Sequence, residues 1–100
     1  MNTAYAVLTI ERERGWGERP DGYYVFANEE SARAYVLEQT KDRIAFQAPD
    51  YYIQYEMHGE APCSLDFQLA ILASPRGFLY VDNLSEMLWS AEQRRKKYST

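Results

Sequence analysis

Cysteine and histidine are nearly absent from this chain of 100 residues, which holds one of each, Cys63 and His58. A lone cysteine cannot close an internal disulfide, and one cysteine with one histidine cannot supply the ligands of a structural zinc site. We therefore expect no metal, no cofactor and a reducing compartment. Cys63 is best explained as a small buried apolar side chain.

Long apolar runs and glycine-rich phosphate loops are missing as well. No stretch approaches the ~20 apolar residues that cross a bilayer, and the first residues lack the basic start and apolar run of a signal peptide. Gly15 and Gly17 flank Trp16 without the lysine that a phosphate-binding loop needs. The sequence therefore predicts a cytoplasmic protein with no nucleotide site and no contact with membranes.

What the chain does contain is apolar and aromatic material. Hydrophobic residues make up 46% and aromatic residues 15% of the sequence, and nine residues are tyrosine. This composition supports a packed core and is unlike that of disordered chains. The length fits a single domain over residues 1–100, as either a monomer or a homodimer.

Hydrophobic periodicity predicts the element order ββαβββα. Apolar residues alternate in the strand segments and recur at helical spacing in the helices. The predicted strands cover residues 3–11, 23–27, 50–58, 65–72 and 78–81, and the helices cover residues 29–45 and a final segment from residue 84 into the basic run at 94–97. This order indicates an α+β fold with one largely antiparallel sheet and both helices packed on one face.

One segment, residues 65–72, fits two structures. Four apolar residues alternate, which favours a strand: Leu65, Phe67, Leu69 and Ile71. Three leucines at helical spacing also suit a short helix: Leu65, Leu69 and Leu72. We prefer the strand, so that the turn at residues 74–77 forms a hairpin with residues 78–81. Asn28 is an expected N-cap of the first helix, and Asp82 or Asn83 of the last.

Charge is distributed unevenly. Four of the 11 basic residues lie at 94–97, so residues 1–93 hold 15 acidic against 7 basic residues, a charge of −8. An acidic body repels phosphate backbones, so we expect no direct nucleic-acid binding and a protein partner with a basic or nucleic-acid-binding surface. The basic run has a second explanation, because cations in the last turn of a helix complement its dipole.

Two segments are candidates for binding this partner. The first is the loop at residues 11–22, in which one tryptophan lies between two glycines and among charges. Tryptophan and arginine dominate interface hot spots, so this loop supplies the candidates Arg14, Trp16, Glu18 and Arg19. The alternative is that Trp16 folds back onto the core.

The second candidate is a sheet face that carries tyrosine. Adjacent strand residues point to opposite faces, so one member of each pair, 23–24 and 51–52, lies away from helices on one face. An open face bearing Tyr24, Tyr52, Gln54 and Glu56 resembles a protein interface. The alternative is a face half-covered by loops.

Catalytic chemistry has few candidates. His58 and Glu56 share a predicted strand face with Glu60 just beyond, and Cys63 could reach His58 across the strand end. Alternating polar residues are typical of any solvent-facing strand, however, and no third group orients a Cys–His pair. We therefore expect that the protein is not an enzyme.

The sequence taken together indicates a small acidic protein-binding module that acts by stoichiometric association. Its size and acidity favour a phage or mobile-element inhibitor of a host nucleic-acid-binding system, such as an anti-CRISPR or other counter-defence protein. The alternatives are an assembly or structural accessory protein, and a small enzyme that uses His58, Glu56 and Cys63.

Overall fold

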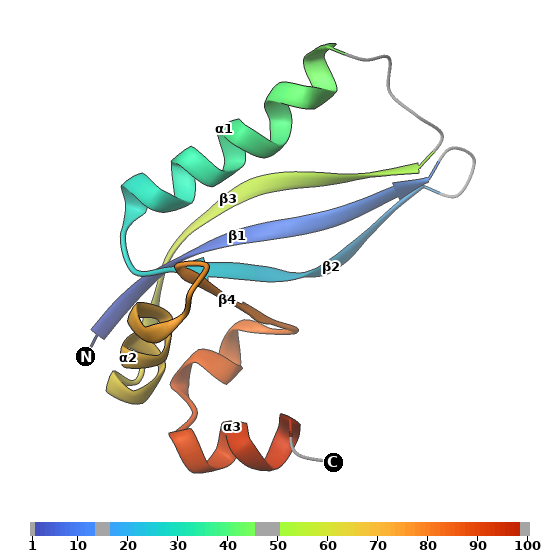
Figure 1. Ribbon diagram of the computed structural model, residues 1–100. Coiled ribbons are helices and arrows are strands. Elements are labelled where there is room, and N and C mark those ends of the chain that lie inside the picture. The colour runs from blue at the N-terminus through green and yellow to red at the C-terminus, as the bar shows by residue number, and fades with distance from the viewer. Residues whose placement is uncertain (1, 14–16, 46–50, 99–100) are drawn as a thin grey trace.

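Three long strands and one short strand form an antiparallel sheet in the computed structural model of the chain, which describes residues 2–13, 17–45 and 51–98 (Figure 1). The strands are β1 (Asn2–Glu13), β2 (Gly17–Phe26), β3 (Tyr51–Cys63) and β4 (Phe78–Val81). Their order across the sheet is β3-β1-β2-β4, and every neighbouring pair is antiparallel. The predicted α+β class with a largely antiparallel sheet is therefore confirmed.

Two bulges shape the long strands. In the pairing of β1 with β3, Ala6 lies opposite Gly59 and Val7 lies opposite Met57, so His58 of β3 is an extra residue. Gly59, which follows it, has a φ of 106°. Glycine suits this left-handed conformation because it has no Cβ. A second bulge lies in β2 opposite Thr9 and Ile10 of β1. There the Thr9 hydroxyl donates a hydrogen bond to the Gly22 carbonyl at 3.0 Å and accepts one from the Gly22 N–H at 3.1 Å.

The short strand β4 pairs with only part of β2. Its four residues face residues 23–26 of β2. Within the described chain, residues 17–22 of β2 therefore have a strand neighbour on the β1 side alone. This stretch includes Pro20, which has no backbone N–H for a further strand to pair with.

The helix α1 (Glu29–Ala45) begins and ends where the sequence predicts. Asn28 is its N-cap, because the Asn28 side chain accepts a hydrogen bond from the Ser31 N–H at 2.8 Å. Glu29 and Glu30 occupy the first turn, where the helix dipole favours anions.

The segment predicted as a fourth strand is instead the helix α2 (Leu65–Ala73), so the preferred interpretation was wrong. Ser64 decides this locally, since its hydroxyl accepts a hydrogen bond from the Phe67 N–H at 3.1 Å and caps the helix. The turn at residues 74–77 forms, with the Gly77 N–H 3.0 Å from the Ser74 carbonyl, but it joins α2 to β4 and makes no hairpin.

The predicted final helix is divided in two. A short 3₁₀ segment, η1 (Leu84–Leu88), is capped by Asn83, and α3 (Ala91–Tyr98) follows. The break falls at residues 89–90, where Ser90 starts a new cap: its hydroxyl accepts from the Gln93 N–H at 3.2 Å and its own N–H donates to the Gln93 side chain at 2.9 Å.

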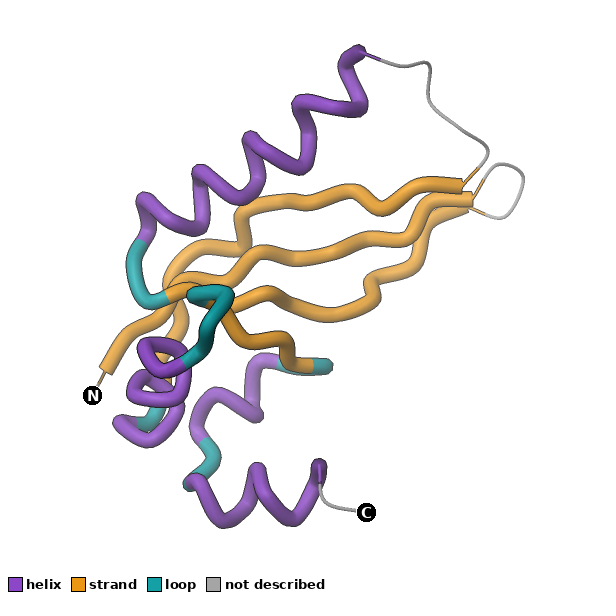
Figure 2. The backbone as a smooth tube through the Cα atoms, in the orientation of Figure 1, coloured by secondary structure: helices purple, strands orange, loops and turns teal. Residues whose placement is uncertain are grey.

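The helices lie on both faces of the sheet, which corrects the prediction that they share one face. Figure 2 shows α1 on one side of the strands and α2, η1 and α3 on the other. Alternate residues of β1 accordingly enter two cores: Ala4 and Ala6 pack with α2 and η1, whereas Tyr5 and Val7 pack with α1.

Two basic residues of α3 hold it against the core that α2 and η1 form with the sheet. Lys97 lies 2.8 Å from the carboxylate of Glu86 and 3.1 Å from that of Asp82. The guanidinium of Arg94 stacks 4.9 Å from the centroid of the Phe67 ring. Part of the basic run is therefore structural, through specific partners as well as the helix dipole.

Candidate functional site

The three residues of the enzyme alternative do not meet. Cys63 is 1% exposed in the core under α2, and burial raises the pKa of its thiol. His58 packs edge-on against Tyr23 at 5.6 Å between ring centroids, and Glu56 accepts a hydrogen bond from Gln54. No group of three His, Cys, Asp or Glu side chains suited to a metal ion lies in the part of the chain that the structure describes.

The predicted loop residues fall partly outside the described chain. Arg14 and Trp16 lie in the segment that the structure does not describe. The prediction of a loop over residues 11–22 was wrong, because β1 runs to Glu13 and β2 begins at Gly17. Glu18 and Arg19 therefore lie on β2, where Glu18 forms an ion pair with Arg12 at 2.7 Å and Arg19 pairs with Glu11 at 2.5 Å across the two strands. The role of this loop in binding stays a prediction.

Three strands share a polar network beside that loop. Arg12 of β1 bridges Glu18 of β2 and Gln54 of β3, and Gln54 in turn donates to Glu56. Gln54 and Glu56 therefore lie together on one face, as predicted. The side chain of Tyr52 is outside the described residues.

Tyr24 does not join this network, which corrects the prediction of one surface containing Tyr24, Gln54 and Glu56. Tyr24 packs on the α1 side, with Tyr35 at 5.4 Å, Tyr55 at 6.3 Å and Tyr80 at 5.3 Å between ring centroids. Gln54 alternates with Tyr55 along β3 and so points to the other face. With helices on both faces, the argument that one tyrosine of each pair must lie outside a core no longer applies.

The tyrosine hydroxyls on the α1 side resist ionisation. Burial raises the pKa of Tyr35 to about 12, and the neighbouring Tyr55 adds to the rise. Burial also raises the pKa of Tyr80 to about 12, and repulsion from the nearby Asp21 carboxylate adds to it. Tyr24, Tyr35 and Tyr55 are therefore mostly packed between α1 and the sheet, and Tyr80 lies at the exposed edge of this tyrosine cluster.

A groove of about 510 Å³ lies between the first turns of α1 and the bulge of β3. Glu29 and Glu60 contribute carboxylates to its wall, and the Arg33 guanidinium pairs with Glu29 at 2.6 Å. Tyr5 and Met57 supply apolar lining. The groove therefore combines an excess of negative charge with apolar surface.

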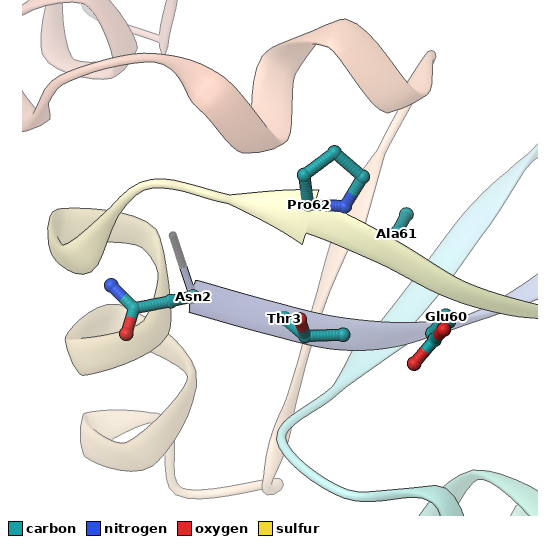
Figure 3. A pocket seen from close by; sticks show the side chains of 5 residues that line it. All are labelled: Asn2, Thr3, Glu60, Ala61 and Pro62. Carbon is teal, nitrogen blue, oxygen red and sulfur yellow. The ribbon is translucent and has the colours of Figure 1, made fainter.

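Two further depressions share residues with the groove. One, of about 250 Å³, is lined by the ends of β1 and β3 and shares Glu60; Figure 3 shows its lining residues Asn2, Thr3, Glu60, Ala61 and Pro62. The other follows the outer face of α1, where it shares Glu29 and Arg33 and adds Glu30 and Leu37. We call the combined area the acidic surface; it holds three carboxylates, Glu29, Glu30 and Glu60, against the guanidinium of Arg33.

Sequence reasoning missed this surface. Glu60 was noted only as a neighbour of His58, and nothing in the sequence brings the start of α1 over the end of β3. The available signal was the acidic first turn, Glu29 and Glu30. It pointed to no binding surface, because the helix dipole alone explains acidic residues at the start of a helix.

A second exposed feature is apolar. Four leucine side chains on α2 and η1 are 50% to 67% exposed: Leu65, Leu69, Leu72 and Leu88. Ser64 joins the two elements, since its N–H donates to the Met87 carbonyl and its hydroxyl to the Trp89 carbonyl, each at 2.8 Å. These hydrogen bonds place the backbone around Leu88 beside the start of α2, and we call the four exposed leucines together the leucine patch.

Comparison with protein-family models, with curated proteins and with solved structures finds no match to this chain. Among the helices that the structure describes, none is both long and apolar enough to cross a membrane.

Proposed function

We propose that the protein acts in the cytoplasm by stoichiometric association with another protein, and that the partner presents a basic surface. The acidic surface carries this proposal. Its carboxylates outnumber its one guanidinium, and they surround apolar side chains of Tyr5, Met57 and Leu37. A lysine or arginine side chain suits such a site, because its apolar stem packs on the lining while its charge meets Glu60 or Glu30.

The composition extends the proposal to a class of partner. A charge of −8 over residues 1–93 attracts proteins whose surfaces have evolved to hold phosphate backbones. An inhibitor of such a protein has only to occupy that surface and needs no catalytic group. We therefore propose a phage or mobile-element inhibitor of a host nucleic-acid-binding system, of the anti-CRISPR or counter-defence kind.

The test measures association while the charge of this surface is changed. Exposed charges are screened over about 8–10 Å at 0.10–0.15 M salt, so affinity for the partner should fall as salt is raised. Glu60→Gln should weaken binding roughly two- to fivefold at low salt, the scale of one exposed ion pair. Calorimetry with the partner, once captured, provides both values.

Glu38→Gln is the matched control. Like Glu60, Glu38 is an exposed carboxylate, but it lies on α1 and lines none of the three depressions. Affinity that is independent of salt and equal for Glu60→Gln, Glu38→Gln and the unchanged chain would refute a basic partner.

A further inference from the structure

The helix α2 is apolar on its inward and outward sides, with Asp66 and Gln68 on its two flanks. Seven of its nine residues are apolar, yet only Phe67 and Ile71 are buried. Helices of this composition are normally enclosed on all sides. In this molecule the inward side is enclosed, and the leucine patch covers the outward side.

The shape of the patch restricts what can cover it. Leu65, Leu69 and Leu72 follow one another at the i, i+4 and i+7 spacing of anchors that helices insert into apolar grooves. Figure 1 shows α2 projecting at the end of the sheet, with its outward side away from the strands. The patch is therefore a ridge, and a ridge is enclosed by a groove.

The area of the patch argues against a second copy of the chain as the occupant. Four half-exposed leucines present on the order of 300 Å² of apolar surface, whereas a stable symmetric pair buries about 800 Å² on each side. Two convex ridges touch along a line and bury little beyond the leucines. A groove also encloses the flanks of the helix, which include Ala73, Gln68 and Asp66.

Polar side chains flank the line of leucines. Asp66 is exposed in the first turn of α2, about a quarter turn from that line, and it already interacts within the chain. The basic character of the partner therefore rests on the acidic surface, and the leucine patch adds an apolar element to the recognition.

We propose that α2 is inserted, leucine patch first, into an apolar groove on the basic partner, a groove about 14 Å long to match nine helical residues. This inference rests on the proposed function and specifies where the partner is held most firmly. The acidic surface then steers the encounter, and the leucine patch determines how slowly the complex dissociates.

The experiment compares four tagged baits in a lysate of the host in which the chain is expressed: the unchanged protein, Leu69→Asp, Lys41→Met and Glu60→Gln. Lys41→Met is the matched control, because Lys41 is exposed on α1, lies outside both the acidic surface and the leucine patch, and its replacement changes the net charge by the same amount as Leu69→Asp. Mass spectrometry quantifies each retained protein, and calorimetry with the purified partner gives the affinities. Thermal melting of each bait verifies folding, which an outward residue should not alter.

The expected result is one protein retained by the unchanged chain and by Lys41→Met but lost with Leu69→Asp. Its affinity for Leu69→Asp should be at least tenfold weaker, and a photo-cross-linker at position 69 should label an apolar groove on it. Leu69→Met should restore binding to within about twofold, because it keeps the volume and apolar character.

Other outcomes overturn the inference in distinguishable ways. A partner that is retained equally by Leu69→Asp but weakened by Glu60→Gln leaves the proposed function standing and removes only the role of α2. Light scattering that shows a dimer converted to a monomer by Leu69→Asp assigns the patch to a second copy. Sedimentation with anionic vesicles that Leu69→Asp abolishes assigns it to a lipid surface. If the unchanged chain retains no protein, both proposals fail.

Discussion

Glu86 has the most restrictive surroundings of any single residue described. Its carboxylate is fully buried, yet it accepts hydrogen bonds from the N–H groups of Asp82 and Asn83 at 2.9 and 3.3 Å. Lys97 supplies the compensating charge at 2.8 Å. A buried charge is tolerated only when it is paired and hydrogen-bonded, so the position of α3 follows from the needs of this one carboxylate.

Replacing Lys97 should therefore be costly. Lys97→Met leaves the Glu86 carboxylate buried beside apolar atoms, and we expect a loss of about 2–3 kcal/mol in the free energy of unfolding. Urea denaturation measures this loss. Lys96→Met is the control: Lys96 pairs with the exposed Glu92 at 3.7 Å, and its loss should cost less than about 0.5 kcal/mol. Equal effects for the two variants would contradict the structural role of Lys97.

Two tyrosines make the stability depend on alkaline pH. The pKa of Tyr35 and of Tyr80 is raised to about 12 from the ordinary 10.0, so the folded chain favours their neutral hydroxyls. Their contribution is fully present below pH 10.0 and is lost as the pH rises toward 12. Unfolding measured against pH should show this decline.

Titration of the tyrosinate absorbance against pH shows which tyrosines cause the loss of stability. In the folded protein Tyr35→Phe and Tyr80→Phe should each remove one late ionisation near pH 12. In concentrated urea all nine tyrosines should ionise together near the ordinary value. A single transition near pH 10 for the folded protein would refute the burial of these hydroxyls.

At the scale of the element, α1 and α2 show what the sequence can decide. α1 was predicted with correct bounds because Asn28 is a strong cap and one face alone is apolar. α2 was mistaken for a strand because apolar residues occur at both spacings, and only the Ser64 cap distinguishes the two. Periodicity fails where a helix is apolar on opposite sides, since it then has no single polar face to mark the period.

Core and surface substitutions in α2 distinguish helix from strand in solution. Ile71→Ala should cost about 2–5 kcal/mol because Ile71 is 1% exposed, whereas Leu72→Ala should change stability by less than about 1 kcal/mol. Denaturant unfolding of both variants provides the comparison. In a strand with Leu69 and Ile71 on the buried side, Leu69→Ala would be as damaging as Ile71→Ala; in the helix it is nearly neutral.

At the scale of the whole molecule, the sheet contributes side chains to two hydrophobic cores, one on each face. The strand pattern predicted the sheet but not the placement of helices on both sides, because Ala4 and Ala6 are small enough to suit either a covered or an open face. Gln54 and Glu56 were correctly placed together by alternation alone. The acidic surface and the leucine patch required the third dimension, since each joins residues distant in the sequence: Glu29 with Glu60, and Leu65 with Leu88.

The incomplete pairing of β2 and the bulge of β3 also bear on how copies of the chain behave when crowded. The exposed edges of the sheet carry features that obstruct the addition of a further strand. On one side β4 has only four residues, and the stretch of β2 beyond it holds Pro20 between Arg19 and Asp21; on the other side β3 has the bulge at Gly59 followed by Pro62. Proline removes the donor that a new ladder needs, and charges and bulges disfavour flat edge-to-edge stacking. The protein should therefore resist fibrillar aggregation at high concentration, and its side-chain surfaces are left as the means of contact with other molecules.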